Sequence, residues 1–514
     1  MKKSRTEMAA KNVVWAYANT FVTTVLKFAC RWAFIRTIGA TYLGINGLYT
    51  SILHVLSLTE LGIGTAMNYS LYKPVAENDR EKIKSLMVYY KKAYTIIAAV
   101  VAGLGVAIIP FLPKLIKGAE GTEHLVLYYV LFLFNTVSSY FVSYKYSLAG
   151  ADQKTYVVNN INTAATIIMN IIQIIALFVF KSFLIYLIVQ IVCLLIGKIY
   201  ASVYLDKMYP FLKEKDVKPV DKQTKDNLFK NVRALVVHKL GDVAVNQTDS
   251  IIISSVINIV VTGLISNYTL IIGTVQTFLV IMFSNITGSL GNLCATSTKQ
   301  KQLEIFKAYD FVSFWLYGFA FIAYLVLIQP FSELMWGKEY VVDNWVVLLI
   351  IINFYLVGRR IPLTNMKIAA GVFQEDRLLP LIQAVVNLVV SIFLAKRIGL
   401  IGIYIGTIVS GLVPTLFRPI LVYRKLFDES SANYFMRFGV HMLIVFAIGA
   451  VTYLACMPIL SRVTWIRFFC AMAVTAILPN AILFILYRKT DEFEYMRNVS
   501  KRIIGKLLRR KKSA

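Results

Sequence analysis

The stretch YVVNNINTAATIIMNIIQIIALFVFKSFLIYLIVQIVCLLIGKIYASVYL (residues 156–205) decides the fold class of this chain. It contains two apolar runs, 156–180 and 182–205, which meet at Lys181. A helix of about 20 apolar residues crosses a hydrocarbon core of ~30 Å, so each run is long enough to span a membrane. The stretch therefore predicts two successive transmembrane helices.

Similar runs recur from end to end of the 514 residues, which are 58% hydrophobic and only 16% charged. Soluble chains carry about 25% charged residues, so a soluble globular class is excluded. The sequence predicts an all-α polytopic membrane protein with about 14 transmembrane helices. The expected spans lie near 12–36, 43–70, 88–112, 124–149, 156–180, 182–205, 232–257, 261–292, 308–335, 343–371, 378–396, 399–423, 434–460 and 464–487.

The net charge of +27 is distributed in a way that indicates a membrane and not a nucleic acid. Most of the 54 lysines and arginines lie in alternate short connections and at both ends of the chain. Basic residues beside transmembrane helices favour the cytoplasmic side, where they interact with anionic lipids. Both termini are therefore predicted to be cytoplasmic, with membrane lipids and no nucleic acid as partners.

Two halves are indicated by a charged connection and a weak internal repeat. TYLGINGL (41–48) resembles VTGLISNY (261–268), and SLAGADQK (147–154) resembles AAGVFQEDR (369–377). Two repeated bundles are a typical plan of transporters. The predicted organisation is a six-helix lobe over 1–205, a cytoplasmic linker over 206–231, a second six-helix lobe over 232–423, two further transmembrane helices over 424–487 and a basic amphipathic cytoplasmic tail over 488–514.

Two cations of the first span are the leading candidates for substrate binding. Lys27 and Arg31 lie four residues apart and so share a helix face. Each charge costs ~3 kcal/mol at mid-membrane, which favours a role beside a water-filled cavity that holds an anion. The alternative is a structural ion pair with an acid on another helix, for which Glu60 is the obvious candidate.

Arg359 and Arg360 are further substrate-binding candidates, because a guanidinium matches two phosphate oxygens at once. They precede Pro362, which should loosen the helix backbone. Adjacent residues of a helix point about 100° apart, so we expect one functional and one structural arginine.

An amide stripe on the fifth span, with Asn159, Asn162 and Asn170, suits either sugar hydroxyls or hydrogen bonding between helices.

Acidic residues in the spans are candidates for coupling transport to H⁺ or Na⁺. Asp242 and Asp249 share one face of the span near 232–257, and Glu60 lies in the second span. Neutralisation of cations from the other lobe is the alternative. We expect no other cofactor and no metal site, since CxxC and HExxH motifs are absent. The GxxxxGK[ST] motif is absent too, so the chain is expected to be a conduit and not an enzyme.

Two segments resemble the polysaccharide transport family of Gram-positive bacteria, which contains O-antigen, capsule and exopolysaccharide flippases. They are LGINGLYTSILHVLSLTELGIGTAMNYSLYKPVAENDREKIKSLM (43–87) and QTDSIIISSVINIVVTGLISNYTLI (247–271). The resemblance implies the multidrug/oligosaccharidyl-lipid/polysaccharide exporter fold, with two six-helix bundles in a V. It also implies a bacterial cytoplasmic membrane, an undecaprenyl-diphosphate-linked oligosaccharide as substrate, alternating access, and polysaccharide polymerase and glycosyltransferases as partners. The thirteenth and fourteenth helices would form a groove for the polyprenyl tail.

Three other functions stay open. A peptidoglycan lipid II flippase and a multidrug or cation antiporter share the same fold. A non-transporting membrane scaffold for a glycosyltransferase complex is the alternative of another class.

Replacing both Lys27 and Arg31 by alanine should abolish polymer export without loss of protein from the membrane, because the phosphate-binding charges are removed. Export and membrane content are measured in cells that depend on this chain. Normal export in the double variant would refute the charge-pairing step.

Overall fold

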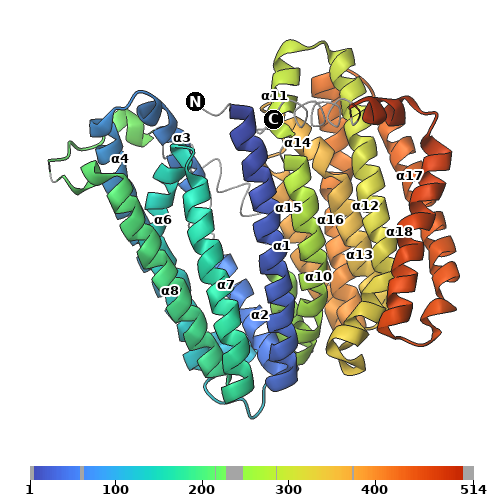
Figure 1. Ribbon diagram of the computed structural model, residues 1–514, viewed down its shortest axis with the longest axis horizontal. Coiled ribbons are helices and arrows are strands. Elements are labelled where there is room, and N and C mark those ends of the chain that lie inside the picture. Colours follow the sequence, from blue (N-terminus) through green and yellow to red (C-terminus); the bar gives the residue numbers. More distant parts are fainter. Residues whose placement is uncertain are drawn as a thin grey trace, which may run out of the picture. The chain divides into compact units, whose positions relative to one another are not determined.

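The computed structural model describes residues 5–57, 63–214, 216–226, 247–284, 286–372, 375–499 and 501, and no strand occurs among them (Figure 1). Eleven helices in these ranges are long and apolar enough to cross a membrane, and they coincide with eleven of the fourteen expected spans. The other three spans differ in what the structure describes. The span 12–36 lies in a helix with several charged residues, the span 43–70 is described except for residues 58–62, and the span 232–257 is described only from residue 247. The all-α polytopic prediction is confirmed.

The first compact unit contains residues 1–266. Helices α7 and α8 run side by side, α4 packs on α6, and α1 packs on α7 (Figure 1). Within the expected span 43–70, α2 extends to Leu56 and α3 is described from Ile63, while residues 58–62 lie outside the described ranges. The main helices are α1 (Arg5–Thr37), α2 (Gly39–Leu56), α3 (Ile63–Ala76), α4 (Arg80–Ile108), α6 (Leu125–Ala151), α7 (Thr155–Phe180) and α8 (Phe183–Met208).

The second compact unit contains residues 267–514, and α12 forms its centre. Helices α13, α17 and α18 all pack against α12, so its apolar residues are buried over most of its length. The helices are the remainder of α10 (Ile259–Ser284), α11 (Thr287–Thr296), α12 (Lys299–Trp336), α13 (Asn344–Arg359), α14 (Ile361–Ala369), α15 (Leu379–Ile398), α16 (Leu400–Val422), α17 (Ala432–Cys456) and α18 (Trp465–Tyr487).

The division between the units falls inside α10 and not at the expected linker. The first turns of α10 pack on α2 of unit 1, so they belong to that unit by their contacts. Residues 215 and 227–246 lie outside the described ranges. These residues form part of the expected linker and most of the expected seventh span. The lobe and linker boundaries therefore stay predictions.

Each of the two repeated segments 41–48 and 261–268 contains a glycine, Gly44 and Gly263, that lies where α2 and α10 cross. A side chain at Gly44 would collide with the Ile259 carbonyl, and one at Gly263 would collide with the Ala40 carbonyl. Small residues let two membrane helices approach closely enough for backbone contact. The crossing brings Ser266, one turn beyond Gly263, to the face of α1 that carries Arg31.

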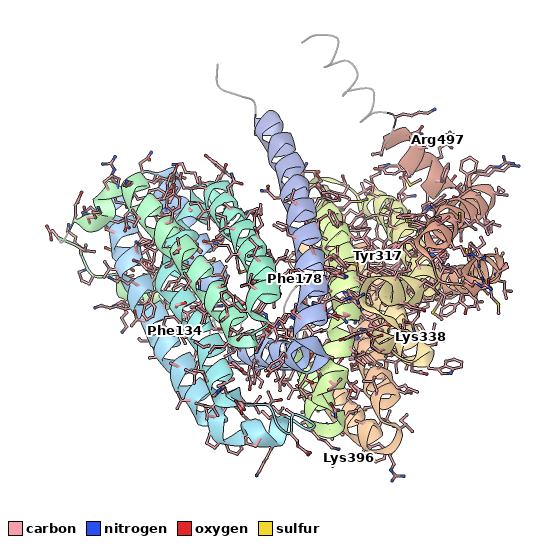
Figure 2. The ribbon with its side chains drawn as sticks, turned by 60° about the horizontal axis from the view of Figure 1, so that its bottom comes forward. Phe134, Phe178, Tyr317, Lys338, Lys396 and Arg497 are labelled. Carbon is pink, nitrogen blue, oxygen red and sulfur yellow. The ribbon has the colours of Figure 1, made fainter. Side chains whose placement is uncertain are left out.

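The two ends of unit 2 carry different basic residues. Lys338 and Lys396 lie at one end of its helices, and Arg497 lies at the other (Figure 2). The tail is helical over residues 491–499, and Phe493 is buried against Trp315, with ring centroids 5.8 Å apart. The expected topology places Lys338 and Lys396 on one side of the membrane and Arg497 on the other, in agreement with this separation. Which of the two sides faces the cytoplasm stays a prediction.

Replacing Gly44 by alanine should destabilise the protein by ~1–3 kcal/mol, because the added methyl group forces the backbones of α2 and α10 apart. Gly47→Ala in the same helix is the matched control, since its methyl group would meet only the Thr262 side chain at 3.8 Å and the Ser266 Cβ at 4.0 Å. The stabilities of both variants are measured as unfolding temperatures of the purified proteins in detergent. Equal unfolding temperatures for the two variants would contradict the close crossing.

Candidate functional site

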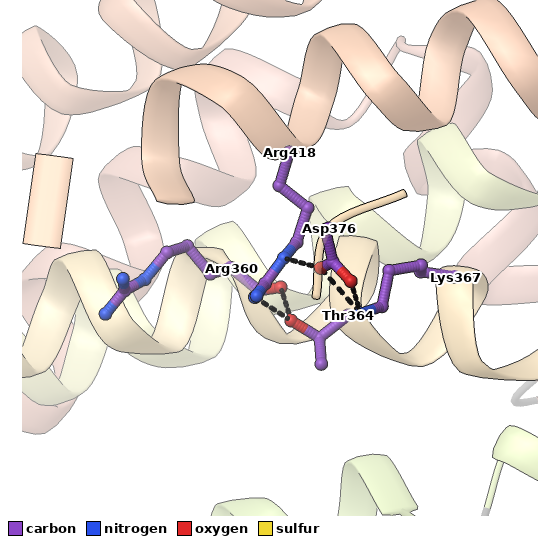
Figure 3. A network of polar contacts seen from close by, with 5 residues as sticks. All are labelled: Arg360, Thr364, Lys367, Asp376 and Arg418. Carbon is purple, nitrogen blue, oxygen red and sulfur yellow. Dashed lines mark hydrogen bonds and ion pairs between the residues drawn. The ribbon is translucent and has the colours of Figure 1, made fainter. Parts of the chain in front are cut away.

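A buried carboxylate of unit 2, Asp376, holds two cations from different helices (Figure 3). The Lys367 Nζ lies 2.7 and 2.6 Å from the two carboxylate oxygens. The Arg418 Nε lies 3.3 Å from Oδ2. Asp376 and Lys367 are only 1% and 4% exposed, so these charges interact in a medium of low dielectric constant.

The chain positions this group through a helix break. Helix α13 ends at Arg359 and α14 begins at Ile361, because Pro362 has no N–H to continue the hydrogen-bond ladder. Thr364 then accepts a hydrogen bond from the Arg418 Nη1 at 3.0 Å and donates one to the Arg360 carbonyl at 2.9 Å. We call Arg360, Thr364, Lys367, Asp376 and Arg418 the Asp376 cluster.

The cluster has three cations and one carboxylate. The Arg360 side chain points away from Asp376, and its Nη1 donates to the Gly411 carbonyl at 3.2 Å (Figure 3). A single carboxylate therefore pairs with two cations, Lys367 and Arg418. Cations that are grouped in this way favour an anionic ligand over a cationic one.

The neighbouring Arg359 has a different environment. It is 0% exposed, and its Nη2 lies 2.8 Å from the Asp310 Oδ2, while its Nη1 donates to the Asp310 carbonyl at 2.7 Å. The rings of Phe314 and Phe438 lie 5.9 and 5.8 Å from the guanidinium carbon. Full burial and pairing with Asp310 favour a structural role, and the expectation that Arg359 binds substrate stays a prediction. The substrate role of Arg360 stays a prediction.

In unit 1, Lys27 is exposed and has no hydrogen-bond or ion-pair partner among the described residues. Arg31, one turn away on α1, is half-buried, and its Nη1 donates to the Ser266 Oγ at 2.7 Å. Glu60, the acid that was expected as an alternative partner, lies outside the described residues. The anion-binding and ion-pair hypotheses for this pair both stay open.

The candidate coupling acids are only partly described. Asp249 is half-buried at the start of the described segment 247–257, whereas Asp242 and Glu60 lie outside the described residues. Within the described ranges, no group of three or more His, Cys, Asp or Glu side chains is arranged to hold a metal ion. Ion coupling stays a prediction.

The amide stripe on α7 divides into two parts. Asn159 and Asn162 are exposed, so their amides are accessible to a ligand. Asn170 is buried, and its Nδ2 donates to the Thr166 carbonyl of the same helix at 2.7 Å. Its hydrogen-bonding capacity is thus partly used within α7, which favours a structural role for this end of the stripe. The sugar-binding role stays a prediction.

Sequence reasoning missed Asp310, Lys367, Asp376 and Arg418. Basic residues near span ends were assigned to the cytoplasm, and Lys367 and Arg418 lie close to the ends of their spans. Lys198 in α8 was missed in the same way: its Nζ donates to the Asn135 carbonyl at 2.8 Å and to the Ser138 Oγ at 3.0 Å. Asp310 is an acid inside an expected span, and this signal predicts a basic partner on another helix, which the structure shows to be Arg359.

The described residues form an all-helical polytopic fold with eleven helices of membrane length. Three solved structures share it. The lipid II flippase MurJ, in an inward closed conformation, has a TM-score of 0.66 at 13% identity, over 92% of this chain and 99% of that chain. An inward-facing multidrug resistance MATE transporter of the MOP superfamily has a TM-score of 0.58 at 13% identity, over 78% of this chain and 94% of that chain. A point mutant of the Vibrio cholerae MATE transporter VcmN has a TM-score of 0.56 at 14% identity, over 82% of this chain and 98% of that chain.

At these identities the similarity shows a shared fold. No protein-family model matches the sequence, and no curated protein matches it either. Membership of the multidrug/oligosaccharidyl-lipid/polysaccharide exporter superfamily and of the narrower polysaccharide transport family therefore stays a prediction.

Asp310→Asn should destabilise the protein by ~3–5 kcal/mol, because the buried Arg359 charge loses its partner. Replacing both residues, as Asp310→Leu with Arg359→Met, should recover most of that loss. The control is Glu304→Gln, which breaks an exposed pair with Lys301 on the same helix and should change the stability by less than ~1 kcal/mol. An unchanged unfolding temperature for Asp310→Asn would rule out the structural role of this pair.

Proposed function

We propose that this protein is a flippase that moves an undecaprenyl-diphosphate-linked oligosaccharide, a precursor of a cell-surface polysaccharide, across the bacterial cytoplasmic membrane. Transport runs from the inner to the outer leaflet by alternating access. The observation that carries the proposal is that two cations from different helices, Lys367 and Arg418, meet at the single carboxylate of Asp376. A diphosphate is an anion of the charge and oxygen geometry that such a cluster binds.

In this proposal, Asp376 acts as an internal counter-ion while no substrate is bound. It holds Lys367 and Arg418 through hydrogen bonds that a phosphate oxygen can replace. The guanidinium of Arg418 already donates to Thr364 through a second nitrogen, so its orientation is set before the ligand arrives. Preorganised donors lower the entropic cost of binding.

The remaining parts of the substrate have separate partners. Lys27 and Arg31 of unit 1 are further phosphate ligands, and the exposed Asn159 and Asn162 bind sugar hydroxyls. The polyprenyl chain stays in lipid. Asp249, Asp242 and Glu60 are the proposed sites of H⁺ or Na⁺ coupling, and polysaccharide polymerase and glycosyltransferases are the proposed partners.

A lipid II flippase is the second candidate. The similarity to MurJ extends over 92% of this chain, whereas the similarities to the two MATE transporters extend over 78% and 82%. A substrate that also carries a diphosphate would use the same cations. A multidrug or cation antiporter is less well supported, because the cluster favours an anionic ligand over a cationic one.

The experiment is translocation of a fluorescent undecaprenyl-diphosphate oligosaccharide in proteoliposomes that contain the full chain. Removing both cations that pair with Asp376, as Lys367→Gln with Arg418→Gln, should lower the translocation rate at least about tenfold, as expected for losing charge-assisted hydrogen bonds to phosphate. The matched control is Lys425→Gln, which removes a charge from an exposed pair with Glu375 at 3.5 Å. Its rate should stay close to that of the unaltered protein.

Wild-type translocation by the double variant, or an equal loss in the control, would overturn the role of the cluster. Lipid II transported in preference to the oligosaccharide would select the second candidate. Unfolding temperatures of all variants, measured in detergent, separate a loss of binding from a loss of folding.

A further inference from the structure

A second site is present in unit 2, at the end where α12 and α17 begin and α18 ends. It is a pocket of about 260 Å³. Its walls come from α12, from α17, and from the last turn of α18 together with the short helix that follows. The lining residues are Lys307, Asp310, Phe311, Met436, Arg437, Val440, His441, Tyr487 and Glu492. None of them belongs to the Asp376 cluster.

One side of the pocket is apolar and continues onto the outer face of α17. Met436 and Val440 line the pocket and are 65% and 47% exposed. Since α17 is one of the membrane-length helices, large exposed apolar side chains on it contact lipid. A ligand in this pocket therefore has an apolar path to the surrounding acyl chains.

Two cations, Lys307 and Arg437, and two carboxylates, Asp310 and Glu492, line the pocket, and Lys307 is left over once Arg359, which pairs with Asp310 from outside the lining, is counted. Asp310 is neutralised by Arg359, and Glu492 lies 3.5 Å from the Arg437 guanidinium. Lys307 is half-buried and has no hydrogen-bond or ion-pair partner within the described ranges. With its two pairs closed, the pocket carries a single positive charge, which matches a monoanion.

The most buried lining residues also have unused hydrogen-bonding atoms. His441 is 8% exposed and stacks on Phe314, with ring centroids 3.9 Å apart, while its Nδ1 has no partner in the described part of the chain. The Oδ1 of Asp310, which is 3% exposed, has none there either. Buried polar atoms without partners cost free energy, and a ligand with hydroxyl groups can satisfy them.

We propose that this pocket binds the headgroup of an anionic phospholipid that carries hydroxyl groups, of the phosphatidylglycerol class. The phosphodiester monoanion pairs with Lys307, and the glycerol hydroxyls hydrogen-bond with His441 and Asp310. The acyl chains lie along Met436 and Val440. A phosphatidylcholine headgroup has neither a net charge nor a hydroxyl group, so it fits less well.

The test measures lipid binding to the purified full chain in detergent, by thermal shift and by native mass spectrometry. The probes are short-chain phosphatidylglycerol, phosphatidylethanolamine and phosphatidylcholine, with inorganic phosphate as a separate arm. Phosphatidylglycerol should bind best. Lys307→Gln should weaken that binding about tenfold or more, because a charge-assisted contact is lost.

Two further variants make the test specific. Lys301→Gln removes a charge from the same helix at an exposed pair with Glu304 outside the pocket, so it should leave lipid binding unchanged. His441→Phe keeps the ring stacked on Phe314 and removes the unpartnered nitrogen. It should raise the unfolding temperature of the lipid-free protein and weaken phosphatidylglycerol binding.

Four results would overturn the proposal. They are equal binding of the three lipids, equal effects of Lys307→Gln and Lys301→Gln, unchanged lipid binding by His441→Phe, and reproduction of the full thermal shift by inorganic phosphate alone. The last result would assign the pocket to a free anion.

Discussion

Two buried carboxylates hold the second unit of this protein together. Asp310 fixes α12 against α13 through Arg359, and Asp376 fixes the segment after α14 against both α14 and α16, through Lys367 and Arg418. In hydrocarbon, a charge without a partner costs several kcal/mol, so each of these acids determines where its cations lie. The arrangement of the helix ends in unit 2 depends on these contacts.

The two acids, Asp310 and Asp376, differ in the number of cations with which each one pairs. Asp310 and Arg359 form a closed pair of equal charge that is shielded by aromatic rings, and this is a structural element. Asp376 instead pairs with two cations, Lys367 and Arg418. The shielded Arg359 pair and the proposed phosphate site therefore lie within a few helix turns of each other but differ in their pairing.

Unit 1 uses a different means of packing. Its α2 and the start of α10 approach to backbone contact at Gly44 and Gly263, and no charge takes part in that contact. The same crossing places the Ser266 hydroxyl against Arg31. The hydrogen bond to this hydroxyl orients the guanidinium of Arg31.

The sequence by itself determined the all-helical membrane class, the positions of eleven membrane-length helices and a loosened backbone at Pro362, because these depend on apolar length and on local backbone chemistry. It also singled out Lys27, Arg31, Arg359 and Arg360, whose substrate roles stay predictions. Only the tertiary structure decided which acids pair with Arg359, Lys367 and Arg418. Asp310 lies 49 residues from Arg359, and Asp376 lies 42 residues from Arg418. Pairing over such separations is set by how the helices pack, and helical periodicity within one span contains no information about its neighbours.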